Sequence, residues 1–175
     1  MQTRTDIKRE LIHMQYEVID NYLPQEQFEI IKNLMMGVDL PWYYNPDVAW
    51  PNEDYVNSMY FTHDFCKGAV VCSGFFNLIL PLIHKIEAKA LIRVKGNMYP
   101  NVGSLLENDR HTDFDFAHKG AIFYINTNNG LTTLEDGTKI ESVANRVLLF
   151  DPSKPHHSTF CTDKKVRVNI NINYF

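Results

Sequence analysis

The sequence has few of the features that mark disulfide-rich or zinc-binding proteins. Its three cysteines, Cys66, Cys72 and Cys161, are far apart, and none has the C-x-x-C spacing of a zinc or redox site. An odd number of widely spaced thiols predicts free cysteines in a reducing compartment. We therefore expect a protein of the cytoplasm without a disulfide framework.

Long apolar segments are also missing. The most apolar stretch runs from Phe75 to Ile83 and ends at His84, well short of the roughly 20 residues that a membrane-spanning helix needs. The first 15 residues mix charged and apolar side chains and lack the apolar centre of a secretory signal. We expect a soluble protein that has no membrane partner.

The chain has no excess of positive charge and no repeats. It has 17 basic and 21 acidic side chains, spread without long runs, for a formal net charge of -4. Nonspecific nucleic-acid binding usually needs a basic patch, so we do not expect it here. With 175 residues, 45% of them hydrophobic, and no Gly/Ser-rich linker, we expect one domain over residues 1–175.

The first half of the chain predicts helices and an aromatic loop. Helical spacing of four apolar side chains predicts an amphipathic helix that ends near Gly37: Phe28, Ile31, Leu34 and Met35. A second apolar helical pattern runs from about Phe75 to Leu91, and Pro81 either kinks that helix or marks its start. The segment from Pro41 to Phe61 is rich in proline and aromatic residues. It either covers the edge of the core or forms a lid over a substrate pocket.

The second half reads as strands. Short apolar runs between turn signals predict strands over residues 120–125, 139–143 and 146–150. The clearest strand covers residues 166–173 and alternates strictly between apolar and polar side chains. Its polar members share one face, which should line a polar pocket or solvent: Arg167, Asn169, Asn171 and Asn173.

Metal chemistry is suggested by the order of four elements. In an extended strand, His111 and Asp113 would point to the same side, although such a pair alone is common in surface turns. A second histidine follows Pro155, at either His156 or His157. Two histidines and one carboxylate are the ligand set of non-haem Fe(II) oxygenases. Arg167 lies 10 or 11 residues beyond the histidine pair, where a guanidinium could bind the distal carboxylate of a dicarboxylic cosubstrate.

From about Met98 to Phe175, the sequence resembles the prolyl-4-hydroxylase-like branch of the Fe(II)/2-oxoglutarate dioxygenases, particularly the small versions of bacteria and their phages. The strings that carry the resemblance are Arg110–Asp115, Tyr124–Asn126, Glu135–Thr138, Asn145–Phe150 and Pro155–His157, followed by Arg167. The resemblance implies a mainly β protein with flanking α-helices. Its double-stranded β-helix, or jelly roll, would occupy about residues 96–175, with helical support over about 1–95.

The resemblance also implies roles for individual residues. His111 and Asp113 would be the first two iron ligands, and Arg167 would hold the distal carboxylate of 2-oxoglutarate. His156 is the preferred third ligand because it follows a proline, and His157 is the alternative. Tyr99 and Tyr124 fall where the family places tyrosines that contact the cosubstrate.

Asn169 departs from the family pattern, which commonly has a hydroxyl residue two positions after the arginine. An amide can still donate a hydrogen bond to a carboxylate, so Asn169 is also a candidate for cosubstrate binding. Asp115 and His118 lie near the metal motif, and we expect both at the mouth of the site or in solvent. The alternative for Asp115, which shares the strand face of Asp113, is to orient a metal ligand or to bind substrate.

The activity implied by the resemblance is hydroxylation of an unactivated C–H bond. The protein would bind Fe(II), consume 2-oxoglutarate and O2, and release succinate and CO2, with ascorbate as a possible reductant. The branch suggests a prolyl residue of a peptide or protein as substrate, and a small molecule is the alternative. Specificity should reside in the Pro41–Phe61 segment and a turn around residues 126–130. Two rival interpretations are a cupin-type binding protein for a metal or small ligand and a Zn(II) hydrolase. The hydrolase has no use for Arg167, and Arg167 on an amide-lined face together with an open iron site favours the oxygenase over the cupin type.

Overall fold

The computed structural model describes residues 16–48 and 59–175. Its elements, in chain order, are β1 (Tyr16–Ile19), α2 (Gln25–Met36), β2 (Tyr43–Asn45), β3 (Tyr60–Lys67), β4 (Val70–Val71), η1 (Phe76–Ile79), α3 (Leu80–Lys85), β5 (Leu91–Pro100), β6 (Lys119–Tyr124), β7 (Asn128–Thr133), β8 (Lys139–Ser142), β9 (Arg146–Phe150), β10 (His157–Ser158) and β11 (Val166–Tyr174). Strands therefore outnumber helices by far among the described residues, as the predicted fold class requires.

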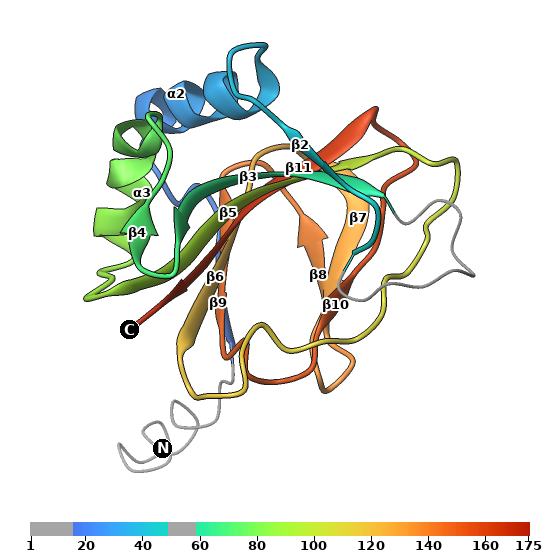
Figure 1. Cartoon of the computed structure of the whole chain (residues 1–175). Coiled ribbons are helices and arrows are strands. Elements are labelled where there is room, and N and C mark those ends of the chain that lie inside the picture. The colour runs from blue at the N-terminus through green and yellow to red at the C-terminus, as the bar shows by residue number, and fades with distance from the viewer. Residues whose placement is uncertain (1–15, 49–58) are drawn as a thin grey trace, which may run out of the picture.

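The strands form two sheets. The large sheet has the order β1-β9-β6-β11-β5-β3-β2, with β4 paired to β3, and the small sheet has the order β10-β7-β8. All of their pairings are antiparallel. In Figure 1 the small sheet lies beside the inner face of the large sheet, while α2 and α3 lie together against its outer face. This is a double-stranded β-helix with flanking helices, which confirms the predicted fold.

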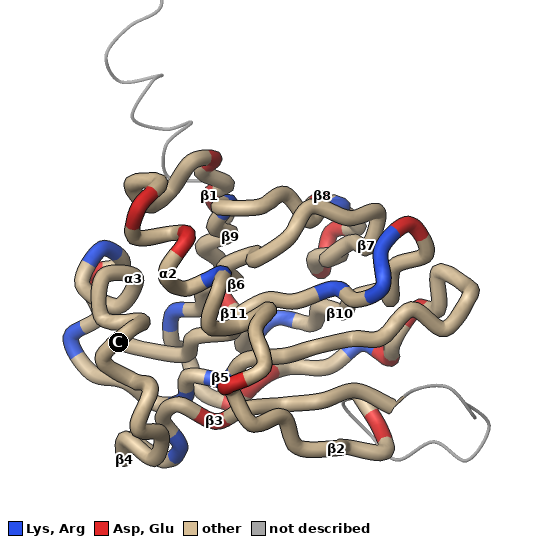
Figure 2. Tube along the Cα trace, turned by 90° about the horizontal axis from the view of Figure 1, so that it is seen from above, with Lys and Arg blue, Asp and Glu red and all other residues tan. Residues whose placement is uncertain are grey.

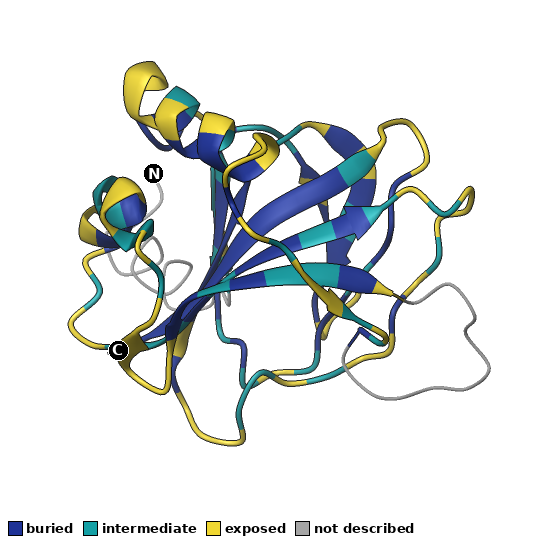
Figure 3. Ribbon diagram, turned by 45° about the horizontal axis from the view of Figure 1, so that its top comes forward, coloured by how far each residue is buried: buried dark blue, intermediate teal, exposed yellow. Residues whose placement is uncertain are grey.

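Strand β11 occupies the centre of the large sheet, between β6 and β5. The alternation seen in the sequence is preserved: Val168, Ile170 and Ile172 are fully buried in the main apolar core, which also includes the helices. The polar residues of the strand face the other way, toward the small sheet, and they too are buried. Figure 3 shows the central strands as buried and the outer surface of the helices as exposed.

Helix α2 forms as predicted. Phe28, Ile31, Leu34 and Met35 are buried, and the ring of Phe28 meets the ring of Phe123 on β6 edge to face, with centroids 6.0 Å apart. Gly37 ends the helix in an extended conformation. A Cβ atom there would lie 2.4 Å from the carbonyl oxygen of Asn33, so glycine is the residue that fits.

The second predicted helix is shorter than expected. It consists of η1 and α3 and ends at Lys85, not at Leu91, because Glu87 adopts a positive φ of 54° that a helix cannot accommodate. Pro81 lies in the first turn of α3, so it marks the start of the helix and does not kink it.

The first half of the chain is not only helical support. It contributes β1, β2, β3, β4 and the first part of β5 to the large sheet, so the division at about residue 95 is wrong. The turn expected around residues 126–130 also differs, since β7 begins at Asn128. Much of the aromatic segment between Pro41 and Phe61, including Trp50 and Pro51, lies outside the described residues.

Charged residues of both signs are interspersed along the chain, without a large region of one sign (Figure 2). Within residues 16–48 and 59–175, no helix has the length and apolar character needed to cross a membrane.

The contact between α2 and β6 makes a stability prediction. Phe28→Ala should lower the free energy of unfolding by about 3–5 kcal/mol, because it removes a fully buried ring and leaves a cavity. Ile30→Ala on the exposed side of the same helix is the matched control and should cost much less. Urea denaturation of both variants measures the difference, and equal losses would contradict the packing described here.

Candidate metal centre

Two histidines face each other across the inner side of the barrel. His111 and His156 form an isolated antiparallel bridge, in which the backbone N–H of each donates to the carbonyl of the other at 3.0 and 2.9 Å. Their ring centroids are 4.7 Å apart. The expected extended strand at His111 is therefore only this bridge, continued by a hydrogen bond from the Asp113 N–H to the carbonyl of Pro152.

Local hydrogen bonds set the orientation of both rings. Nδ1 of His111 lies 3.2 Å from the carbonyl oxygen of Asp109, and Nδ1 of His156 lies 3.0 Å from that of Lys154. When Nδ1 carries the proton and donates, Nε2 keeps a free lone pair for a metal. Burial, and then the neighbouring His156, lower the pKa of His111, which favours the neutral ring that binds metals.

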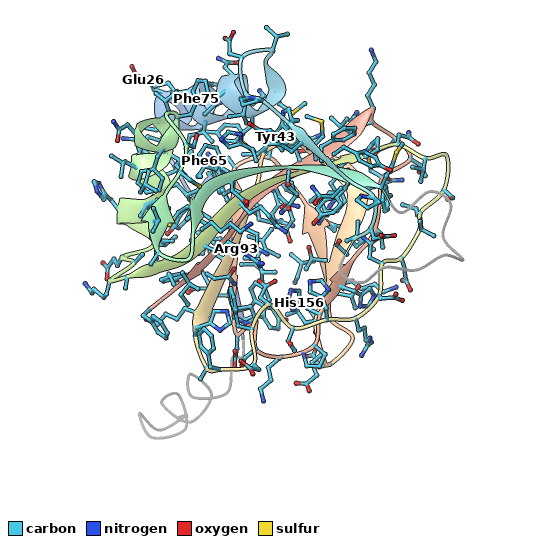
Figure 4. All side chains as sticks on the ribbon, in the orientation of Figure 1. Glu26, Tyr43, Phe65, Phe75, Arg93 and His156 are labelled. Carbon is cyan, nitrogen blue, oxygen red and sulfur yellow. The ribbon has the colours of Figure 1, made fainter. Side chains whose placement is uncertain are left out.

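Asp113 completes the group. Ligand atoms of His111, Asp113 and His156 all lie within 4.8 Å of one another, and Nε2 of His111 is 3.9 Å from Oδ1 of Asp113. His157 is not part of this group. It is paired with Thr133 of β7, and its buried Nδ1 atom has no hydrogen-bond partner among the described residues. Figure 4 shows His156 between the two sheets, in the space that Arg93 also enters.

Three side chains hold the Asp113 carboxylate in place. Arg93 Nη2 on β5 lies 2.8 Å from Oδ1, while Nδ2 of Asn173 and Nδ2 of Asn171 on β11 donate to Oδ2 at 2.8 and 3.2 Å. Burial alone would raise the pKa of Asp113, but Arg93, His156 and the hydrogen bond from Asn173 outweigh burial and lower it to about 2. The carboxylate is therefore ionised and oriented at neutral pH.

Arg167 is buried in the same region without a counter-charge. It is 1% exposed, and its guanidinium lies near the rings of Tyr99 and Tyr124, at 5.3 and 5.9 Å from their centroids. Nε donates to Ser142 Oγ and Nη2 to Thr132 Oγ1, both at 3.0 Å, but Nη1 has no partner. No carboxylate of the described residues forms an ion pair with it. A buried cation in this state favours an anionic ligand.

One cavity joins this arginine to the metal group. Its lining includes Arg167, His111, His156, Tyr99 and Asn169. A dicarboxylate could therefore reach the unpaired Nη1 with one end and the metal position with the other. Two imidazoles, one carboxylate and this guanidinium fit Fe(II) and 2-oxoglutarate by their chemistry.

The remaining predicted site residues lie close by. Tyr99 lines the cavity, whereas the hydroxyl of Tyr124 donates to Thr132 Oγ1 at 2.9 Å. Burial raises the pKa of both tyrosines. Asn169 lines the cavity and accepts a hydrogen bond from Asn97 Nδ2 at 3.0 Å through its own Oδ1. Its amide N–H groups are thus directed elsewhere, and its cosubstrate role remains a prediction.

His118 was expected at the mouth of the site or in solvent, and this is wrong. It is buried, with Nδ1 2.8 Å from the carbonyl oxygen of Phe116 and Nε2 3.1 Å from Nδ2 of Asn173. His118 therefore fixes the amide that holds Asp113. Asp115 is exposed, as expected.

Sequence reasoning missed Arg93, Thr132 and Ser142. A signal existed for Arg93, because residues 91–99 alternate and place Arg93 on the same face as Asn97 and Tyr99. Thr132 and Ser142 could not be found in this way, since hydroxyl residues are common on exposed strand faces and only the pairing of the two sheets brings them to Arg167.

No protein-family model and no curated protein matches this sequence significantly. Solved structures do match. A prolyl hydroxylase from Trichoplax adhaerens, in complex with a hypoxia inducible factor peptide fragment, matches with a TM-score of 0.69 and 14% identity over 100% of this chain and 94% of that one. The viral collagen prolyl hydroxylase of Paramecium Bursaria Chlorella virus-1 matches with a TM-score of 0.65 and 13% identity, over 93% and 96%.

A third match is HygX from Streptomyces hygroscopicus, whose structure holds nickel, 2-oxoglutarate and hygromycin B. Its TM-score is 0.60 and its identity 10%, over 99% of this chain and 87% of that one. The chain therefore has the fold of prolyl hydroxylases and related 2-oxoglutarate oxygenases over nearly its whole length.

Proposed function

We propose that this protein is an Fe(II)- and 2-oxoglutarate-dependent dioxygenase that hydroxylates an unactivated C–H bond. One observation carries the proposal: both histidines of a two-histidine, one-carboxylate group line the same cavity as a buried guanidinium that has no counter-charge among the described residues. A Zn(II) hydrolase would have no use for Arg167 at this place, and O2-dependent consumption of 2-oxoglutarate distinguishes the enzyme from a cupin-type binding protein. The shared fold supports the same assignment.

Each residue has a definite task in this proposal. His111 and His156, through Nε2, and Asp113 would hold the iron, and Arg167 would bind the distal carboxylate of 2-oxoglutarate. Bound Fe(II) supplies O2 activation coupled to decarboxylation of 2-oxoglutarate to succinate and CO2, with ascorbate as reductant. Arg93 and Asn173 keep Asp113 ionised and oriented for this task.

The substrate class is a finer part of the proposal. The resemblance in the metal motif favours a prolyl residue of a peptide or protein. Among the structures of the same fold, one contains a peptide and another contains hygromycin B, so a small molecule is the alternative. The cytoplasm remains the expected compartment, in agreement with three free thiols, Cys66, Cys72 and Cys161.

The central test is metal-dependent succinate formation. His111→Ala should reduce O2-dependent succinate production to background, because one of three iron ligands is lost. The melting temperature should change little, since the apolar core lies on the opposite face of the sheet. His84→Ala, at an exposed histidine of α3 that lines neither cavity near the metal group, is the matched control and should retain turnover. Succinate production by His111→Ala at the wild-type rate would rule out the assignment.

The choice of third ligand can be tested without turnover. His156→Ala should weaken Ni(II) binding by more than about 100-fold, because even residues that only orient a ligand contribute about 10–100-fold. His157→Ala should change it only a few-fold, since His157 lies outside the group. Isothermal titration calorimetry of the two variants measures the contrast, and the reverse order would make His157 the ligand.

Gly130 on β7 tests the role of Arg167 indirectly. A Cβ atom on Gly130 would lie 2.6 Å from Cδ of Arg167 and 2.8 Å from Oδ1 of Asn128. Gly130→Ala should therefore displace the guanidinium and weaken 2-oxoglutarate binding to the Ni(II)-loaded protein by about tenfold or more. Gly74→Ala is the control, because nothing lies within 4 Å of the added methyl group. Unchanged 2-oxoglutarate affinity in Gly130→Ala would argue against Arg167 as the anchor.

A further inference from the structure

A second, larger cavity opens on the other side of the metal group. It has a volume of about 410 Å³, and its lining includes His111 and Asp113 together with Arg93, Lys95 and Asn45. It meets the smaller cavity of Arg167 at shared lining residues: Asn97, Tyr99, His111 and Asn171. If the smaller cavity holds 2-oxoglutarate, the larger one is where a substrate can approach the same metal.

Lys95 is the charged group of this cavity that lacks a counter-ion. Its Nζ donates to the hydroxyl of Tyr60 at 3.4 Å and lies 5.5 Å from the centroid of that ring. Among the described residues no carboxylate forms an ion pair with it. Its neighbour across the strand pair, Asp64, is 3.9 Å from Lys67 instead. Burial, and then the charge of Arg93, lower the pKa of Lys95 to about 8, so it is still mostly charged at pH 7.

The other charges near the metal do not neutralise Lys95. Arg93 is paired with Asp113, and Asp47 is the further carboxylate among the described residues of the lining. When both are bound, the positive charge of Fe(II) cancels the negative charge of 2-oxoglutarate. The described side chains that line the two cavities then carry three positive charges, on Arg93, Lys95 and Arg167. They carry two negative charges, on Asp113 and Asp47. Among the described residues that line the two cavities, one positive charge remains. A single anionic group would balance it.

Two buried amide oxygens lie beside this cation. Asn171 is the strand partner of Lys95 on β11, and Asn97 follows Lys95 on the same face of β5. The Oδ1 atoms of both are buried and have no hydrogen-bond partner. Unpaired buried acceptors favour a ligand that brings N–H or O–H donors. The cavity thus offers one cationic donor and two acceptors close to the metal position.

From this arrangement we infer that the substrate carries a carboxylate, bound by Lys95, next to N–H or O–H groups that Asn97 and Asn171 accept. The inference rests on the proposed function for the position of the metal, and it narrows the substrate to a small carboxylic acid or a peptide whose carboxylate is close to the reacting carbon. A neutral residue inside a peptide would leave Lys95 unbalanced.

A matched pair of ligands tests the inference without turnover. Protein loaded with Ni(II) and saturated with 2-oxoglutarate, which occupies Arg167, is titrated at pH 7 with N-acetyl-L-proline or its neutral amide. The signal of Lys95 in ¹³C-lysine-labelled protein reports binding up to ~100 mM, well above the millimolar range expected of such small ligands. The acid should bind about 10- to 100-fold more tightly than the amide, as expected for a charge-assisted hydrogen bond.

In Lys95→Met this signal is lost, so binding is followed in both proteins by the relaxation that the bound Ni(II) imposes on the protons of the ligand. Lys95→Met should remove the preference for the acid while leaving 2-oxoglutarate affinity within about twofold, because Lys95 does not line the smaller cavity. Lys67→Met, at an exposed lysine of β3, is the matched control and should keep the preference. Peptides ending in a free carboxylate or an amide then distinguish a peptide terminus from a free acid.

Three results would overturn the inference: no saturable shift of the Lys95 signal with the acid, equal binding of acid and amide, or an undiminished preference in Lys95→Met. These results leave succinate formation by the wild-type protein untouched. Conversely, carboxylate binding at Lys95 in a protein that forms no succinate would preserve the inferred anion site and reject the oxygenase.

Discussion

The structure depends on β11 having two buried faces of opposite character. In most antiparallel sheets one face is apolar and the other meets water. Here the outward side chains Val168, Ile170 and Ile172 pack under the helices, and the inward ones are buried between the two sheets. A one-residue shift of this strand would place Arg167 in the apolar core and an isoleucine against the metal ligands. The register of β11 with β5 and β6 therefore fixes both the core and the site.

A buried polar face is costly unless its groups satisfy one another. The part of the inner face around Asp113 achieves this through one continuous hydrogen-bond network. Asn173 donates to Asp113 and approaches His118, and its Oδ1 accepts from Nε of Arg93, which also pairs with Asp113. The carboxylate is thereby ionised and held without a metal. The loops that carry His111 and His156 are fixed separately, by their reciprocal backbone hydrogen bonds.

The sequence allowed the fold class, helix α2 and strand β11 to be predicted because each depends on a local period. Four of the residues that line the cavity of Arg167 follow from motif spacing: His111, His156, Arg167 and Asn169. Spacing could not choose between His156 and His157, since adjacent residues differ only in the face of the strand they occupy. The backbone bridge between His111 and His156 makes that choice in the structure.

Other parts of the structure depend on distant contacts that have no local signature. The first half of the chain adds strands to the large sheet because β1 pairs with β9 and β3 pairs with β5, across long stretches of sequence. Helix α3 ends early because Glu87 turns the backbone toward β5. His118 reads as an exposed histidine until Asn173, 55 residues away, is placed beside it.

The polar groups of the inner face fall into two sets. One set is hydrogen-bonded within the folded chain, and the other is left for a ligand. Nη1 of Arg167, Oδ1 of Asn97 and Oδ1 of Asn171 are buried without partners, whereas the carboxylate of Asp113 is fully engaged. The groups that orient the metal ligands are thus complete before any ligand arrives. Those left incomplete face the two cavities. Because each costs stability in the folded chain, ligands that complete them should bind only the folded state and stabilise it, by an amount that rises with the logarithm of their concentration above the Kd.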